Sequence, residues 1–155
     1  MYVLEELEQV VLSILDPLTD EGVKTLELYD GQAEADDVKE LAKINVLFPC
    51  LWVIATSLSN ITKNTNDDQK IGVLLIIGDK NLRGVDLAKT GSDTNIGVYK
   101  ILKLSQNLLH RKNIRASGDV TISGTMRLKK VAPMFLAPKR GLCFYSSMYE
   151  FETIN

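Results

Sequence analysis

Residues Ile71 to Ile77 form the feature that most limits how this chain can fold, because no polar side chain stands at either alternating position of the run. A strand that is apolar on both faces is typical of the centre of a sheet covered on both sides. A second apolar run, Cys50 to Leu58, is rich in β-branched residues and precedes it. Because only the polar stretch from Asn60 to Gln69 separates the two runs, a long hairpin is predicted.

Helices are predicted where apolar residues recur every three or four positions. The first fifteen residues show this spacing, and the helix is expected to end before Pro17, since a proline disfavours helical geometry in the preceding residue. Residues 36–43 predict a short helix that begins at a capping aspartate. Asp93 or Thr94 is expected to cap a longer helix, whose buried stripe comprises Val98, Ile101, Leu102, Ser105, Leu108 and Leu109.

Strands are predicted where apolar and polar residues alternate. Residues 120–129 have the cleanest alternation in the chain, which indicates a strand with one face in water. Two more strands are expected over Val23–Tyr29 and Leu142–Ile154. In the last of these the pattern slips near Ser146-Ser147, which indicates a β-bulge there.

The connections complete the expected fold. Residues 78–94 are polar and predict a surface loop, and Pro133 and Pro138 are expected to break the chain before the last strand. The order is then helix, strand, helix, two strands, helix, two strands. This order predicts a single α+β domain over residues 1–155, with a mainly antiparallel mixed sheet and helices packed on one face. At this length roughly two-thirds of the chain's surface can be buried, so disulfides or metals are not needed to stabilise a core.

Charge is unevenly distributed along the sequence, although the formal net charge is only −2. Residues 1–45 contain 12 acidic and 3 basic side chains, whereas residues 99–141 contain 1 acidic and 10 basic side chains. Such a chain either folds its acidic and basic parts against each other or presents them on different faces. In the second case the acidic side of one copy would attract the basic side of another, favouring a head-to-tail contact. The simpler alternative is that these charged side chains are solvated at the surface and cluster along the sequence without a function.

The residue types that carry catalysis or cofactor binding are sparse. A phosphate-binding loop needs Gly-Lys-Ser/Thr in that order, but here Lys89-Thr90 precedes Gly91. His110 is the one histidine and has no carboxylate or cysteine beside it in sequence, so a structural role as a cation at a helix end is expected rather than metal binding.

Other candidate groups favour the same interpretation. Cys50 and Cys143 each lie within an apolar strand-like stretch, so buried free thiols are expected instead of a disulfide. Ser146-Ser147 has no base near it in sequence, and the adjacent aspartates of the chain are typical of caps and solvated turns. We therefore expect no enzymatic activity, no cofactor and no metal site.

Nucleic-acid binding remains an open alternative at this point. Eight basic residues cluster in the last third of the chain and are suited to phosphate contacts with a salt-sensitive affinity. Against this, the sequence pI is about 5.4, and no aromatic residues alternate with the basic ones as a base-stacking platform requires. The eight residues are Arg111, Lys112, Arg115, Arg127, Lys129, Lys130, Lys139 and Arg140.

Three stretches together resemble a known family: GVLLIIGDKNLRG, IGVYKILKLSQNLLHRKNI and VAPMFLAPKRGLCFYSSMYEFETIN. The shared pattern is Asn-Leu-Arg after a central strand, a Gly-aliphatic-Tyr helix start, and a tyrosine-bearing last strand that ends near Phe-Glu-Thr. On these motifs the chain resembles the Mu-like phage tail-terminator family, which is broadly similar to the lambda tail-completion protein U. The segment RLKKVAP departs from the pattern, so the surface it forms is not predicted by the resemblance.

The resemblance implies a structural protein of a phage or phage-derived tail that forms a hexameric ring. Such a ring caps the tail tube, and the sheath in contractile tails, stops polymerisation and presents a surface for head joining. The implied partners are other copies of the chain, the tube and sheath proteins, and a head-completion or connector protein, with DNA only passing through the lumen. The implied location is the virion tail, and the host cytoplasm during assembly, without membrane attachment.

Five residues are the expected interface positions. Arg127 and Lys129 share an exposed strand face and are the first candidates. Arg83 either contacts a neighbouring subunit or closes its own loop. Asp67 and Asp68 lie at the expected hairpin tip, which either reaches the tube or has no partner. Two rival functions stay open: a different head–tail joining protein of the same fold, and a nucleic-acid-binding accessory protein.

Overall fold

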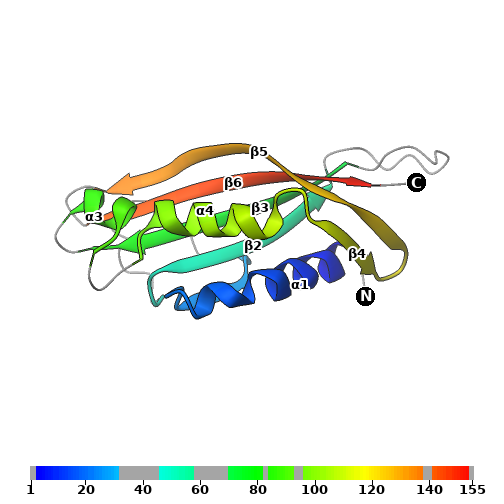
Figure 1. Ribbon diagram of the computed structural model, residues 1–155, viewed down its shortest axis with the longest axis horizontal. Coiled ribbons are helices and arrows are strands. Elements are labelled where there is room, and N and C mark those ends of the chain that lie inside the picture. Colours follow the sequence, from blue (N-terminus) through cyan, green and yellow to red (C-terminus); the bar gives the residue numbers. More distant parts are fainter. Residues whose placement is uncertain are drawn as a thin grey trace.

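The computed structural model describes residues 3–31, 46–57, 70–81, 84–92, 96–137 and 141–153, and these form one six-stranded mixed sheet with helices on one face (Figure 1). The strands lie in the order β1-β2-β3-β6-β5-β4. The elements are α1 (Val3–Leu15), the 3-10 helix η1 (Asp16–Thr19), β1 (Thr25–Leu28), β2 (Cys50–Ser57), β3 (Lys70–Lys80), α3 (Val85–Thr90), α4 (Val98–Leu109), β4 (Asn113–Ser117), β5 (Thr121–Ala137) and β6 (Leu142–Thr153).

The pairing of the strands confirms the predicted α+β class and the mainly antiparallel character of the sheet. β1 pairs in parallel with β2, and every other neighbouring pair is antiparallel. β2 and β3 form the predicted hairpin, from Cys50 opposite Gly78 to Ser57 opposite Ile71. β3 lies in the middle of the sheet, between β2 and β6, as its two apolar faces predicted.

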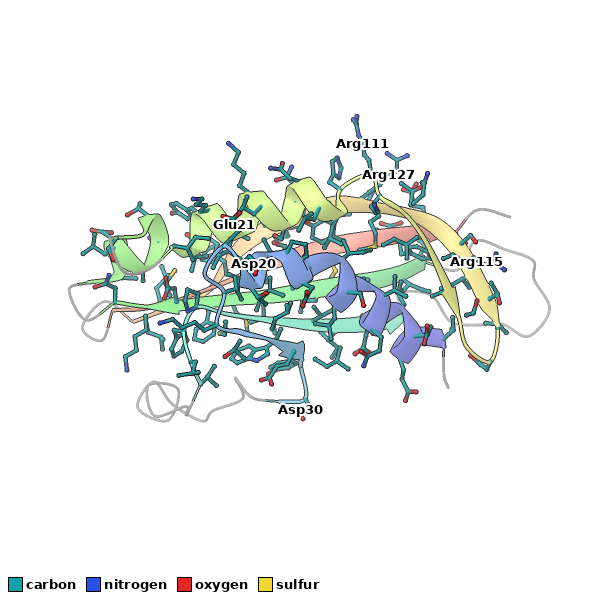
Figure 2. All side chains as sticks on the ribbon, turned by 60° about the horizontal axis from the view of Figure 1, so that its bottom comes forward. Asp20, Glu21, Asp30, Arg111, Arg115 and Arg127 are labelled. Atoms are coloured by element: carbon teal, nitrogen blue, oxygen red, sulfur yellow. The ribbon has the colours of Figure 1, made fainter. Side chains whose placement is uncertain are left out.

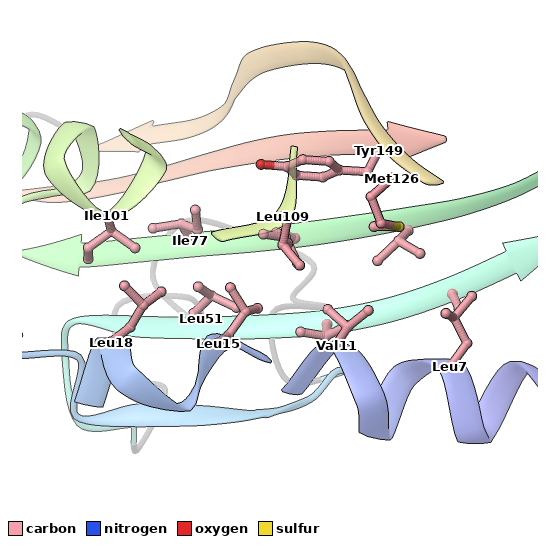
Figure 3. Close-up of a cluster of buried hydrophobic side chains, with 14 of the residues drawn as sticks. Leu7, Val11, Leu15, Leu18, Leu51, Ile77, Ile101, Leu109, Met126 and Tyr149 are labelled. Atoms are coloured by element: carbon pink, nitrogen blue, oxygen red, sulfur yellow. The ribbon is translucent and has the colours of Figure 1, made fainter. Parts of the chain in front are cut away.

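The main core lies between the sheet and the helices α1 and α4 (Figure 3). α1 turns Leu7, Val11 and Leu15 onto the sheet, and all three are fully buried. α4 contributes Ile101 and Leu109 from the apolar stripe predicted for it. Both helices cover one face because their apolar positions recur at helical spacing and can be buried only against the sheet.

A second, smaller core lies on the opposite face of the sheet. Its buried members are Cys50, Trp52, Ile76, Leu142 and Phe144. The rings of Trp52 and Phe144 stack with centroids 5.8 Å apart and planes 11° from parallel. Trp52 therefore belongs to the part of the core that the helices do not cover.

The region expected as one loop from residue 78 to 94 is more ordered than predicted. β3 continues to Lys80, and the short helix α3 follows at Val85. The polar residue Asp79 misled the prediction, because its side chain is fully buried and its Oδ1 accepts a 2.7 Å hydrogen bond from the backbone N–H of Lys80. α4 begins at Val98 after Gly97, which has φ 86° and no side-chain cap, so the predicted cap at Asp93 or Thr94 is wrong.

The prediction that Pro133 breaks the chain is also wrong. β5 runs through Pro133, and its register against β6 shifts between Leu128 and Lys130 and again between Pro133 and Phe135. The bulge predicted in the last strand near Ser146 therefore lies instead in the neighbouring strand β5. A strand tolerates proline at a bulge or on an open edge, where no ladder hydrogen bond is lost.

Two further expectations have separate outcomes. The predicted helix over residues 36–43 lies outside the described residues. β4 was not predicted. Its residues alternate between exposed and buried, but only Ile114 and Ala116 are buried, so the apolar pattern is too short to stand out. In the described parts of the chain, no helix combines the length and apolar character needed to cross a bilayer.

Candidate interaction surface

Of the five predicted interface residues, the structure places Arg127 and Lys129; Arg83, Asp67 and Asp68 lie outside the described residues. Arg127 and Lys129 belong to β5 and reach the same partner, Glu152 of β6, so they share a face as predicted. This face is the one opposite the helices, because Arg127 pairs with Glu150 and the same side of β6 carries Phe144 of the smaller core.

Arg127 and Lys129 form ion pairs within their own chain. Arg127 Nε donates a 2.9 Å hydrogen bond to Glu152 Oε2. Lys129 Nζ lies 3.7 Å from Glu152 Oε1 and 3.9 Å from Glu150 Oε2. Lys70 Nζ of β3 completes the cluster, 3.8 Å from Glu150 Oε1. Because the two carboxylates offset most of the positive charge, this surface is a mixed charge cluster and not a basic patch.

We expect Arg127→Gln to lower the free energy of unfolding by only about 0.2–1 kcal/mol, since the ion pair is half exposed and screened by solvent. Urea unfolding measures this change. Lys70→Gln is the matched control, because it removes a longer pair, with a more exposed cation, from the same cluster. If Arg127→Gln clearly weakens self-association while its stability is unchanged, Arg127 is instead an interface residue.

Three basic side chains that form no ion pair with any described residue lie at or next to β4, the outermost strand on one side of the sheet. Arg111 and Lys112 form the turn between α4 and β4, and Arg115 projects from β4. All three are exposed. Arg111 has φ 65°, so this tight turn holds its backbone in the left-handed region.

Three exposed acidic side chains lie next to η1 and β1, where Lys24 is also exposed. Asp20 and Glu21 follow η1, and Asp30 follows β1, the outermost strand on the side opposite β4. Figure 2 shows Asp30 and Arg111 projecting from opposite margins of the molecule, with Arg115 at the β4 end. Asp30 and Arg111 thus lie on different sides of the described residues, although the acidic helix α1 packs against β4, which carries Arg115.

The structure also reveals an exposed apolar region that the sequence analysis missed. Tyr99, the second residue of α4, is 45% exposed. Its ring packs edge-on against Tyr145 with centroids 5.6 Å apart, and the two hydroxyl oxygens lie 3.3 Å apart. This hydrogen bond, more than burial, raises the pKa of Tyr145 to about 12. In the sequence, the apolar run around Pro133 was the signal for an exposed apolar region. The sequence analysis instead interpreted this run as a break in the chain before the last strand.

His110 has a structural role. Its Nδ1 accepts a 3.0 Å hydrogen bond from the backbone N–H of Leu128, so the imidazole joins the end of α4 to β5.

Both thiols of the protein are buried. Cys50 and Cys143 are free and buried, as predicted. Burial raises the pKa of both thiols, that of Cys143 to about 11. Little thiolate forms at neutral pH, so both thiols are poor nucleophiles. Among described residues, no three or more histidine, cysteine or acidic side chains are grouped so that they could hold a metal ion. Comparison with protein-family models and with curated proteins finds no match to this chain.

Proposed function

We propose that this protein is a structural subunit of a phage or phage-derived tail, which joins to copies of itself head to tail and caps the tail tube as a terminator. The observation that carries the proposal is the placement of opposite charges at the two edge strands of one sheet. Asp30 directly follows β1, whereas Arg115 lies on β4 and Arg111 in the turn before it. The resemblance in sequence to the tail-terminator family adds the biological setting.

The physical argument concerns the symmetry of the contact. A head-to-tail contact uses two different surfaces of each subunit and closes into a ring when the rotation between copies allows it. Opposite charges on those surfaces steer the encounter and disfavour contacts between two like surfaces. A ring built in this way needs no reactive group, which fits the burial of both cysteines.

We expect Arg115→Glu to weaken self-association about tenfold, or about 1.4 kcal/mol, because it places a negative charge on the edge strand β4. Analytical ultracentrifugation across a concentration and salt series measures the effect. Lys24→Glu is the matched control: it changes the net charge equally, but it lies beside β1, the edge strand on the opposite side, and makes that side more acidic. It should not weaken association.

Two results would contradict the proposal. A chain that stays monomeric at every concentration, alone and with tail-tube protein, does not terminate tails. A monomer that binds DNA, and loses that binding in Arg115→Glu, would support the rival nucleic-acid-binding function, because Arg111, Lys112 and Arg115 would then contact phosphates. Addition of tube protein distinguishes a terminator from a head-joining protein, which would not bind the tube end.

A further inference from the structure

The second half of β5 has an open edge. β4 pairs with β5 only from Thr121 to Thr125, and His110 accepts the hydrogen bond that the backbone of Leu128 donates. Over residues 130–136, which we call the open segment, no described residue outside β6 pairs with β5 through its backbone (Figure 1). An open strand edge offers unpaired N–H and C=O groups to another strand.

The open segment carries exposed apolar side chains on the sheet face that α4 partly covers. Val131 is 44% exposed and Leu136 39%. Residues that lie opposite each other in an antiparallel pair share a face, and alternate residues of a strand share it too. The opposite pairs are Val131 with Ser147, Pro133 with Tyr145 and Leu136 with Cys143. Because Tyr145 packs against Tyr99 of α4, these side chains form an uncovered apolar strip on the helix-bearing face.

A positively charged groove on α4 adjoins this strip. The groove has a volume of about 570 Å³ and includes Tyr99, which connects it through Tyr145 to the open segment. Lys100 and Lys103 line it, both are exposed, and neither forms an ion pair with a described residue. No carboxylate is among its lining residues, which are Thr90, Tyr99, Lys100, Lys103, Leu104 and Asn107.

The other face of the open segment is basic as well. Lys130 lies opposite Met148 and directly precedes Val131, so alternation turns its side chain to the face away from α4. Lys130 is exposed and forms no ion pair with a described residue. An entering strand would therefore meet apolar side chains on one face and a cation on the other.

We infer that the open segment of β5 binds an extended segment of a partner protein in which apolar and acidic residues alternate. Backbone hydrogen bonds to the open edge select an extended chain, and its apolar side chains cover Val131 and Leu136. Its acidic side chains then lie on the other face near Lys130. Acidic residues that flank the paired stretch are attracted by Lys100 and Lys103 of α4. The inference does not depend on the proposed function, because it uses neither β1 nor β4.

The chemistry of this surface favours such a segment over two other occupants. A second copy would bring its own open segment, but residues 129–137 contain two lysines and no acidic residue to complement them. Lysine, proline and bulges on an edge also disfavour pairing with an identical edge, and β5 has all three there. A nucleic acid would attract the lysines, but its phosphates gain nothing from the exposed Val131 and Leu136.

An NMR titration of the intact protein tests the inference. The probe is a short synthetic peptide in which valine and glutamate alternate, and the control is the same peptide with lysine in place of glutamate. The glutamate peptide should shift the backbone amide signals of residues 130–136, other than Pro133, and of α4 around Tyr99. Higher salt should weaken its binding. The lysine peptide should leave these signals unchanged.

Two charge variants test the contribution of the groove. Lys103→Glu should weaken binding of the glutamate peptide about fivefold or more, because it places a negative charge in the groove. Lys24→Glu is the matched control, since Lys24 is also an exposed lysine without an ion pair to a described residue, but it lies beside β1. It should bind the peptide as the natural sequence does.

Two further variants test the apolar strip. Val131→Asp should also weaken peptide binding about fivefold or more, because it removes an apolar contact and repels the acidic residues. Val120→Asp is the matched control: it is the same substitution at a similarly exposed position, 51% against 44%, outside the open segment. Thermal unfolding of both variants shows whether either change acts through the fold.

Four results would overturn the inference. They are the absence of shifts with the glutamate peptide, equal shifts with both peptides, equal effects of Lys103→Glu and Lys24→Glu, and equal effects of the two valine variants. Shifts of the open segment that follow protein concentration without peptide would assign the edge to a second copy. Shifts that a DNA oligonucleotide causes in place of the peptide would assign it to nucleic acid. Either assignment also overturns the inference, and the tail function is tested separately by self-association.

Discussion

Trp52→Ala is expected to lower the free energy of unfolding by about 3–5 kcal/mol, the largest effect of any single substitution proposed for this protein. Trp52 is fully buried and forms the centre of the smaller core on the sheet face that α1 and α4 do not cover. It stacks on Phe144 and lies 5.9 Å, centroid to centroid, from the ring of Tyr29. Removal of the indole leaves a cavity that these rigid neighbours cannot fill. Urea unfolding measures the loss.

The control for Trp52→Ala separates packing from hydrogen bonding. Trp52 Nε1 donates a 3.0 Å hydrogen bond to Glu27 Oε1. Trp52→Phe removes this bond but keeps an aromatic ring, so it should cost clearly less than Trp52→Ala. If the two variants are equally destabilised, the hydrogen bond to Glu27 and not the stacked rings holds β1 and β2 together.

Gly78→Ala should destabilise the protein by about 1–3 kcal/mol, although the change adds a single methyl group. Gly78 of β3 is paired with Phe144 of β6, and the Phe144 ring occupies the space where a Cβ on residue 78 would lie. The ring cannot move away easily, because it is stacked on Trp52 and packs edge-on against Phe48. The added methyl group therefore forces the ring or the strand to shift. Thermal and urea unfolding measure the effect.

A second-site variant tests this explanation. In a Phe144→Leu background the ring that meets the new Cβ is gone, so Gly78→Ala should cost much less there than in the natural sequence. Coupling of this kind is expected between residues in contact. Additive effects of the two substitutions would show that Gly78 is needed for its backbone freedom and not for the space it leaves to Phe144.

The stability of the smaller core matters for the proposed assembly. Trp52 and Phe144 stack across β3 and join β2 to β6, so the loss of either ring can change the curvature of the sheet. A change in that curvature would alter the angle between a subunit's two interaction surfaces. Ring closure depends on this angle. Variants of the smaller core that still fold should therefore be examined for assembly as well as for stability.

The sequence alone determined the elements whose pattern is local and strong. α1, the stripe of α4, the β2–β3 hairpin and the central position of β3 follow from apolar periodicity, because each must bury a continuous apolar face. The α+β class follows from the order of these elements. The separation of acidic and basic segments could also be counted directly along the chain.

Only the tertiary structure decided the features that depend on partners distant in sequence. Pro133 continues β5 because this part of the strand has a bulge and an open edge. Asp79 is buried within β3, Tyr99 is exposed beside Tyr145, and Arg127 and Lys129 are paired with Glu150 and Glu152. The physical reason is the same in each case: a residue's own neighbours in sequence set its local conformation, whereas its burial and charge pairing depend on which strand lies beside it.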